Sequence, residues 1–315
     1  MRVFVTGGTG FVGQHLCASL LRDGAEVYVL SANPPPSSDM NENYHFVLGD
    51  ICDEKTVEDL LNSVKPDQAY HLAAISAVPV SWQKPRATFD LNVWGTFNVL
   101  RACSRLAACP RVLNVSTGAV YAPSGELLTE SSPLMPTNPY AASKAMAELV
   151  RFQFPDLPVI TTRAFNHSGA GQTTAFVLPA LAKQVADIES GAVPAVVSSG
   201  ALDVERDFLH VADVIAAYRL LMDSGKPGEV YNVSSGEPRK LSGALTKLLA
   251  FAGVTAEIRV DSTRIRWEQV AKIAASSGKL RRHTGWKPAK SWDDLLRDLL
   301  QYWRQQGAAS APSRA

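Results

Sequence analysis

The chain has 315 residues, of which 46% are hydrophobic, so it is long enough to form about two domains with substantial cores. Its 31 Lys and Arg residues nearly balance 30 Asp and Glu residues, leaving a formal net charge of +1. This balance argues against a nucleic-acid partner and against an anionic membrane surface. No basic and apolar leader and no run of about 18 apolar residues occurs, so we expect a cytoplasmic protein without a membrane span.

Short β-branched runs alternate with longer amphipathic stretches from residue 1 to about residue 160. The expected strands are 2–7, 26–32, 44–50, 68–74, 111–117 and 159–165. The expected helices are Phe11–Arg22, Glu54–Val64, Arg86–Arg105 and Pro139–Phe154. This alternation predicts an α/β protein of the Rossmann type, with a doubly wound parallel sheet covered by helices on both faces.

The alternation breaks after Arg163, where a Gly-rich loop (HSGAGQ) precedes an expected helix from about Phe176 to Ser190. We therefore predict a dinucleotide-binding domain over residues 1–163 and a smaller C-terminal α/β substrate lobe. The substrate lobe is expected to cover 164–205 and 237–306, while 206–236 returns a strand and a helix to the main sheet. The segment 307–315 has no apolar periodicity and is expected to be a disordered tail.

Glycines at positions 7, 10 and 13 directly follow the first expected strand, in MRVFVTGGTGFVGQHL. Gly7 permits a sharp turn, Gly10 lets a pyrophosphate approach the backbone, and Gly13 lets the next helix pack closely on the strand. Glycines alone also suit a tight structural turn, but the strand before them and the helix after them favour a dinucleotide site. Phe11 and Val12, which lie between these glycines, belong to the same predicted site.

The end of the second expected strand should distinguish two cofactors, because an acid there binds the ribose of NAD and a base accepts the phosphate of NADP. The segment reads Leu30-Ser31-Ala32-Asn33 and offers neither. NADH and NADPH therefore both remain open, with Ser31 expected at the cofactor. Asp50 and Ile51 follow the third strand and are expected at the adenine edge, the alternative role of Asp50 being to cap the next helix.

The segment NPYAASK places Tyr140 and Lys144 four residues apart, on one face of an expected helix. A phenol has an ordinary pKa of about 10, so acting at neutral pH asks for a fall of about 3 units, which a nearby ammonium supplies in part. Upstream, Ser116 and Thr117 end a strand at the carboxyl edge, where open α/β sheets bind ligands. A hydroxyl at that edge can donate to a carbonyl oxygen as negative charge builds up on it.

The glycine loop, the hydroxyl pair and the YxxxK spacing, in this order, resemble the short-chain dehydrogenase/reductase superfamily, in its extended branch that modifies nucleotide sugars. The resemblance covers about residues 1–304. It implies that Thr117 is the catalytic hydroxyl and Tyr140 the proton donor or acceptor. It also implies that Lys144 binds the nicotinamide ribose and lowers the pKa of the tyrosine.

The same resemblance implies further cofactor contacts from HLAA and LNVWGT, namely Leu72, Ala73, Ala74 and Asn92. His71 is interpreted as structural, since its neighbours are apolar. The helices around Arg86–Arg105 and Pro139–Phe154 resemble the pair through which this branch dimerises, which implies a homodimer. No metal site is implied.

Dehydratases of this branch follow the active-site Thr with acidic residues, because elimination of water needs an acid and a base besides the tyrosine. Here the corresponding positions are Gly118 and Ala119, which disfavours a dehydratase. Epimerases and reductases remain, since both need only hydride transfer and the tyrosine proton.

The second half, in RAFNHSGAGQ, ERDFLHVADVIAAY and RRHTGWKP, resembles reductases that convert GDP-4-keto-6-deoxy-D-mannose to GDP-D-rhamnose. This implies a nucleotide-sugar substrate, with a GDP-sugar favoured and Asn166 at its diphosphate. Lys183, Arg206 and Arg264 are further expected ligands, although a solvated lysine would explain Lys183 equally well. The alternatives are a nucleotide-sugar 4-epimerase, then a GDP-mannose 4,6-dehydratase, and, outside enzymes, an NAD(P)-sensing protein without catalysis.

Overall fold

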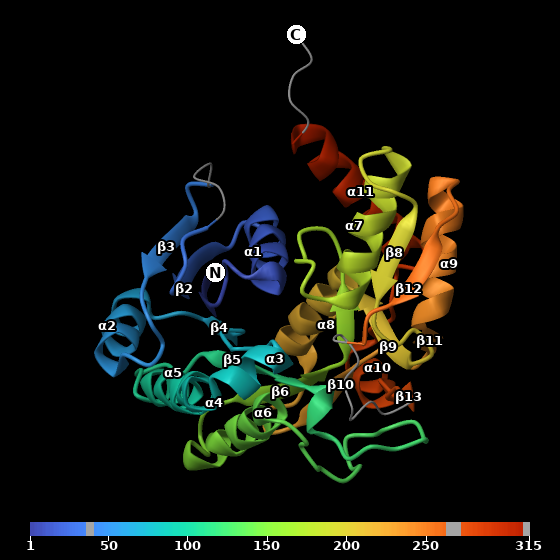
Figure 1. Cartoon of the computed structure of the whole chain (residues 1–315). Helices are drawn as coiled ribbons and strands as arrows, with labels where there is room; N and C mark the ends of the chain where they lie inside the picture. The colour runs from blue at the N-terminus through green and yellow to red at the C-terminus, as the bar shows by residue number, and fades with distance from the viewer. Residues whose placement is uncertain (36–40, 263–271, 311–315) are drawn as a thin grey trace.

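The computed structural model describes residues 1–35, 41–262 and 272–310, with side chains up to residue 308. The described chain forms two lobes (Figure 1). The N-terminal lobe surrounds a seven-stranded sheet, here called the main sheet, and the second lobe carries two smaller sheets.

The main sheet is parallel throughout, with the strand order β10-β6-β5-β4-β1-β2-β3. Its strands are β1 (Arg2–Thr6), β2 (Glu26–Ser31), β3 (Tyr44–Leu48), β4 (Gln68–His71), β5 (Arg111–Thr117), β6 (Val159–Ala164) and β10 (Val230–Val233). The chain reverses direction across the sheet between β1 and β4, which is where open α/β sheets bind their ligands. The predicted fold class is confirmed.

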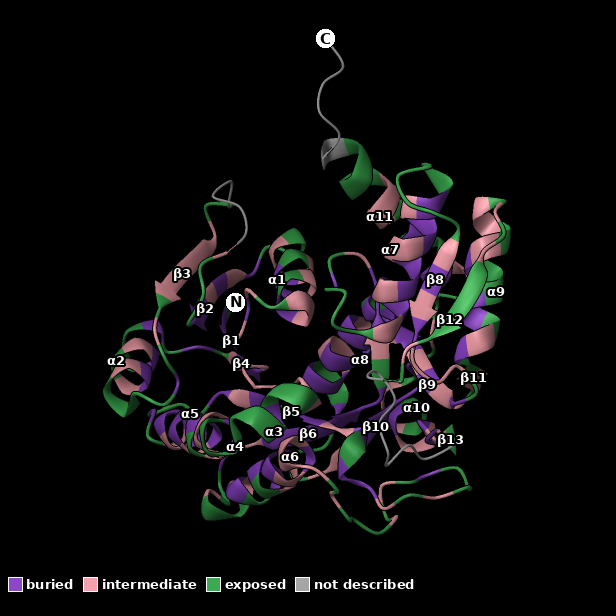
Figure 2. Ribbon diagram, in the orientation of Figure 1, coloured by how far each residue is buried: buried purple, intermediate pink, exposed green. Residues whose placement is uncertain are grey.

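Helices cover both faces of the main sheet, because its strands are apolar on both sides. One face packs against α1 (Phe11–Arg22), α8 (Val211–Ser224) and α10 (Gly278–Thr284). The other packs against α2 (Glu54–Val64), α5 (Gly95–Ser104) and η3 (Val150–Gln153), the turn that continues α6 (Pro139–Leu149). Figure 2 shows buried residues gathered on the central strands and on the inward sides of these helices.

The helix expected over Arg86–Arg105 is divided by a π turn. α3 (Val78–Gln83) and α4 (Pro85–Phe89) lead into η1 (Asp90–Trp94), and α5 follows. The N–H of Gly95 donates to the carbonyl of Asp90, five residues back, so the turn holds one residue more than an α turn. A regular apolar period cannot predict such an insertion.

The second lobe has its own core between three helices, α7 (Val177–Glu189), α9 (Leu241–Ala252) and α11 (Trp292–Ser310). Its four-stranded sheet contains β7 (Asn166–Ser168), β9 (Glu205–His210), β11 (Pro238–Lys240) and β13 (Lys272–Ile273). Its two-stranded sheet pairs β8 (Val196–Ser199) with β12 (Glu257–Val260).

Two features differ from the sequence expectations. The strand at 206 does not return to the main sheet, because the Asp207 carboxylate accepts hydrogen bonds from Ser235 and Gly236 and ties β9 to the second lobe. α8 and β10 do return to the main sheet. The tail was expected to be disordered from 307, whereas α11 continues past Gly307 through Ser310, over two alanines that favour a helix. Residues 311–315 lie outside the described residues.

Candidate active site

The glycine loop forms the close turn that the sequence predicts. Gly7 has φ +68°, and a Cβ on it would lie 2.8 Å from the backbone nitrogen of Ala73. A Cβ on Gly13 would overlap the carbonyl oxygen of Gly7. The N–H of Gly10 donates to that same oxygen at 3.0 Å. Side chains are therefore excluded at Gly7 and Gly13. At Gly7 the loop lies directly against the segment that follows β4.

Helix α1 begins with open backbone donors. Its N-cap is Gly10, which has no side chain to bond the first N–H groups of the helix. The N–H groups of Phe11, Val12 and Gly13 point out of the first turn, where the helix dipole favours an anion. A diphosphate fits this cradle.

At the end of β2, the Ser31 hydroxyl is hydrogen-bonded to the Thr9 hydroxyl at 2.7 Å. The alternative role considered for Asp50, capping the next helix, is wrong, because Asp53 caps α2 by accepting from two backbone N–H groups. Asp50 instead accepts from the N–H of Cys52 at 2.9 Å and is exposed, while Ile51 is buried.

Thr117 and Tyr140 meet at the carboxyl edge of the main sheet. Thr117 is the last residue of β5 and Tyr140 lies in the first turn of α6, which Asn138 caps through the N–H of Ala141. The two side chains are close enough for Thr117 to lower the pKa of the Tyr140 phenol. Lys144 follows one helical turn later and is only 4% exposed. The structure thus brings together the three residues predicted to be catalytic.

The ionisation of this group differs from the sequence expectation. Burial raises the pKa of the Tyr140 phenol, and the neighbouring Thr117 offsets only part of that effect, so the net shift is opposite to the expected fall. The lowering expected from Lys144 stays a prediction. Burial also lowers the pKa of Lys144 to about 8, against the opposing effect of Glu148. The phenol therefore remains protonated at neutral pH, as a proton donor must be.

His71 and Asn92 fix the backbone around the site. His71 is bonded through its two ring nitrogens to the hydroxyls of Thr6 and Thr96. Burial, and then the charge of Lys144, lower its pKa to about 3, so it is neutral. Asn92 lies in η1, accepts from the N–H of Ile75 and donates to Ser143 of α6. These bonds fit a structural role for His71.

The segment after β4 is held against the glycine loop. The N–H of Leu72 donates to the carbonyl of Thr6, and the N–H of Ala73 donates to the Thr6 hydroxyl. Leu72, Ala73 and Ala74 therefore lie between the glycine loop and the loop at Ile75 that Asn92 holds. This is the place predicted for a cofactor-lining strand end.

Sequence reasoning missed a buried ion pair behind the catalytic residues. Ser116 does not join Thr117 at the ligand edge, because alternate residues of a strand face opposite sides. Its hydroxyl donates instead to Glu148 at 2.6 Å, and Glu148 accepts three charged hydrogen bonds from Arg163. The available signal was the spacing of Glu148, four residues after Lys144 on α6.

The expected substrate residues are more dispersed. Asn166 is exposed on β7, and its amide donates to the carbonyl of Asp207 at 3.2 Å. Lys183 pairs with Asp187 on its own helix at 2.6 Å. Arg206 lies on β9, where it donates to the carbonyl of Glu205. Arg264 lies outside the described residues.

The loop after Asn166 reaches back to the glycine loop. The ring of His167 stacks on Phe11, with 6.2 Å between ring centroids and 8° between planes. His15 of α1 is bonded to the carbonyl of Ala170 at 2.9 Å. The Gly-rich loop of the second lobe is thereby docked on the helix that begins the predicted dinucleotide site.

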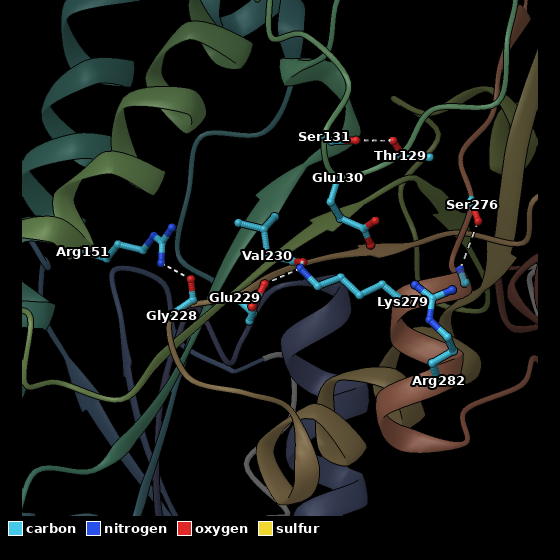
Figure 3. Close-up of a pocket in the computed structure, with 11 residues that line it drawn as sticks. Thr129, Glu130, Ser131, Arg151, Gly228, Glu229, Val230, Ser276, Lys279 and Arg282 are labelled. Atoms are coloured by element: carbon cyan, nitrogen blue, oxygen red, sulfur yellow. Dashed lines mark hydrogen bonds and ion pairs between the residues drawn. The ribbon is translucent and has the colours of Figure 1, made fainter.

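A cavity of about 580 Å³ lies elsewhere, beside the amino end of β10 (Figure 3). Its walls include Arg151, Glu229 and Lys279, and Lys279 forms an ion pair with Glu229. Arg151 donates to the carbonyl of Gly228. Because the strands are parallel, this cavity lies at the sheet edge opposite to Thr117 and is not the catalytic site.

Comparison with known proteins identifies the family. The sequence pattern described as GDP-mannose 4,6 dehydratase matches residues 4–299. The protein belongs to the GDP-mannose 4,6-dehydratase family. This family is of the extended short-chain dehydrogenase/reductase type, as the motifs predicted.

Individual members of this group carry different activities. The chain is 34% identical to GDP-6-deoxy-D-mannose reductase of Pseudomonas aeruginosa, covering 97% of this chain and 98% of that protein. The structure of RMD from the same organism, complexed with NADPH, has a TM-score of 0.85 at 33% identity, covering 97% of this chain and 99% of that one. The UDP-glucose 4-epimerase of Thermus thermophilus, complexed with NAD, has a TM-score of 0.85 at 29% identity, covering 96% and 99%.

These relatives confirm the predicted class, an enzyme of the NAD(P)-dependent short-chain dehydrogenase/reductase type. The dinucleotide seen in the solved relatives agrees with the open N–H groups of α1 and with the crowded glycines of this member of the family. In the described residues no helix has both the length and the apolar character that crossing a membrane requires.

Proposed function

We propose that the protein uses NADPH or NADH to reduce the C4 keto group of a nucleotide-activated 6-deoxy-4-keto-hexose. The favoured substrate is GDP-4-keto-6-deoxy-D-mannose and the favoured product is GDP-D-rhamnose. The observation that carries this choice is at Gly118, where a Cβ would lie 2.7 Å from the Phe165 ring. An acidic side chain at position 118 would therefore have to displace a buried ring. The next residue, Ala119, has no acidic group either.

Two further observations support reduction. Within the described residues, one carboxylate is bonded to the strand beside Thr117, that of Glu148. Its oxygens already accept hydrogen bonds from Ser116 and Arg163. It is not free to act as the base that elimination of water requires. The similarity to a GDP-6-deoxy-D-mannose reductase extends over nearly the whole of both chains.

The chain's own residues supply the proton chemistry. A bound reduced nicotinamide supplies a hydride to C4 of the sugar. Tyr140 donates its phenolic proton to the carbonyl oxygen, and Thr117 donates a hydrogen bond that holds the oxygen in place. The ketone becomes an alcohol, the dinucleotide is left oxidised, and a proton from solvent restores the phenol. The charge of Lys144 stabilises the phenolate that forms in between.

The proposed substrate contact in the second lobe is Asn166. It follows Phe165 directly and is exposed, and the stacking of His167 on Phe11 holds its loop near the cofactor end of the site. Lys183 is a weaker candidate, because its ammonium is already paired with Asp187. Arg206 and Arg264 stay predictions.

One incubation tests the proposal against its rivals. The protein is mixed with GDP-4-keto-6-deoxy-D-mannose and either reduced dinucleotide, and the loss of reduced nicotinamide is compared with the sugar product seen by NMR. We expect one reduced cofactor to be oxidised for each C4 alcohol formed.

Parallel samples contain GDP-mannose, or a UDP- or GDP-hexose, with oxidised cofactor. Interconversion of hexoses without net cofactor change would replace the proposal by an epimerase. Formation of the keto sugar from GDP-mannose would replace it by a dehydratase. Cofactor binding without turnover in any sample would favour the NAD(P)-sensing alternative.

We also propose that the protein is a homodimer. Large apolar side chains are exposed on the helices expected at the dimer contact, including Trp94 at 58%, Leu149 at 60% and Phe152 at 63%. Such side chains gather at interfaces between protein chains. Sedimentation should give the mass of two chains, and the double variant Leu149→Glu, Phe152→Glu should sediment as one chain.

A further inference from the structure

The buried ion pair of Glu148 and Arg163 lies directly behind the catalytic residues. Glu148 and Lys144 are neighbours on α6, one helical turn apart. The side chains of Glu148 and Arg163 are only 6% and 7% exposed. A buried ion pair of this kind is often no more stabilising than apolar side chains of similar size. Its position next to Lys144 therefore suggests a role besides stability.

Glu148 is held rigidly in one orientation. One carboxylate oxygen accepts from the Ser116 hydroxyl at 2.6 Å, and the other accepts from Arg163 at 2.7 Å. Arg163 also donates to the carbonyl of Glu130, and its guanidinium lies 4.7 Å from the centroid of the Tyr121 ring. Because Ser116 precedes Thr117 on β5, the carboxylate joins the strand of the catalytic hydroxyl to the helix of Tyr140 and Lys144.

Glu148 is also the charged group that acts on Lys144. Burial alone disfavours the ammonium, and Glu148 works against this effect. Two other groups near Lys144 carry no charge at neutral pH. They are His71 on β4, on which the charge of Lys144 acts, and Tyr140, one turn earlier on the same helix. Arg163, on β6, is turned toward the carboxylate.

From this geometry, and building on the function proposed above, we propose that Glu148 is a positioning residue for the reduction. Anchored by Ser116 and Arg163 one helical turn from the buried Lys144, its carboxylate keeps the ammonium beside Tyr140 charged. Glu148 does not touch the reacting atoms in this scheme. Its effect on the reaction is transmitted through Lys144.

The test is to remove the charge and keep the shape. In Glu148→Gln the amide oxygen can still accept from Ser116, but the negative charge is lost. We expect the pKa of Lys144, followed by NMR titration of isotope-labelled lysine, to fall by about one unit. The alkaline limb of kcat/KM for the keto sugar should move by the same amount. At a pH above both limbs, kcat/KM should fall by about tenfold relative to the parent protein.

A second variant guards against failure to fold. Glu148→Gln leaves Arg163 buried without its carboxylate, which is costly. The double variant Glu148→Gln, Arg163→Gln replaces both charges by amides and should fold, while Lys144 still lacks its carboxylate and its pKa stays low. Glu58→Gln is the matched control, because it breaks an ion pair with Arg105 on the outer helices and should leave the titration of Lys144 unchanged.

The two proposals fail in different ways. The titration of Lys144 needs neither sugar nor cofactor, so a wrong substrate leaves the shift intact and refutes only the proposed function. If folded Glu148→Gln and the folded double variant both show the Lys144 titration of the parent protein, Glu148 is purely structural. The positioning role is then overturned, even if reduction of the keto sugar is confirmed.

Discussion

The strands of the main sheet pair in parallel with their neighbours and, apart from the edge strand β3, are largely buried. The four-stranded sheet of the second lobe instead collects strands from 166–168, 205–210, 238–240 and 272–273. The lobe of the main sheet holds the crowded glycine loop and the three predicted catalytic residues, Thr117 on β5 and Tyr140 and Lys144 on α6. The second lobe carries Asn166 and the loop that docks on Phe11. We therefore expect the reaction chemistry to depend on the regular lobe and substrate selection to depend on the irregular one.

The largest expected effect in the regular lobe is that of Tyr140→Phe. Removing the proton donor should lower kcat by about 10²- to 10⁴-fold. The affinity for reduced cofactor, measured by fluorescence titration, should change little, because the phenol oxygen is the only group removed. A variant with nearly full activity would show that the proton comes from another residue and would undo the assignment of this lobe.

The next effect compares one glycine from each lobe. In Gly13→Ala the added Cβ would overlap the backbone of Gly7 and Gly8, which cannot move without opening the loop. We expect a loss of about 1–3 kcal/mol in the free energy of unfolding and a cofactor affinity lower by about tenfold to hundredfold.

Gly243→Ala in α9 of the second lobe is the matched control, since a Cβ there meets no atom within 4 Å. It should stabilise the protein by up to about 1 kcal/mol and leave cofactor affinity unchanged. Denaturant unfolding and cofactor titration measure both variants. Equal effects at the two positions would contradict the crowding of the glycine loop.

The pH dependence of kcat/KM should also report on the regular lobe. Burial lowers the pKa of Lys144 to about 8, so its positive charge is present below that pH and is lost as the pH rises through it. The rate constant should therefore fall about tenfold per unit above pH 8. Lys144→Met should have low activity, and its kcat/KM should not show this fall above pH 8. An unchanged limb in that variant would assign it to another group.

The smallest effect is expected from Asn166→Ala in the second lobe. We expect KM for the nucleotide sugar to rise about three- to tenfold, with little change in kcat, because a contact far from the reacting carbon contributes similarly to the bound substrate and to the transition state. Steady-state kinetics with the cofactor saturating measures the split. A fall in kcat at constant KM would show that Asn166 takes part in the chemical step. The division of roles between the two lobes would then be wrong.

The sequence predicted most where local patterns decide the structure. The bounds of α1, α2 and β5 agree with the expected Phe11–Arg22, Glu54–Val64 and 111–117. In these segments one apolar period and the flanking turn residues are sufficient. The sharp turn expected at Gly7 is also present, since this residue has φ +68°.

Features that depend on distant contacts could not be predicted. β9 belongs to the second lobe because Asp207 binds Ser235 and Gly236, which no local pattern reveals. Glu148 looks like an ordinary charged residue of an amphipathic helix until β5 and β6 bring Ser116 and Arg163 to it. The ionisation of Tyr140 was misjudged for the same reason, since its burial depends on the packing of the whole site.

The π turn at Asp90–Trp94 has a consequence for anyone who redesigns this protein. Its additional residue turns Asn92 fully inward, where it holds the loop at Ile75, and leaves Trp94 outward on the proposed dimer face. Deleting one residue to straighten the helix would rotate everything on one side of the deletion by about a quarter of a revolution. We therefore expect the proposed dimer contact and the proposed cofactor contact of Asn92 to be disturbed together by such a deletion.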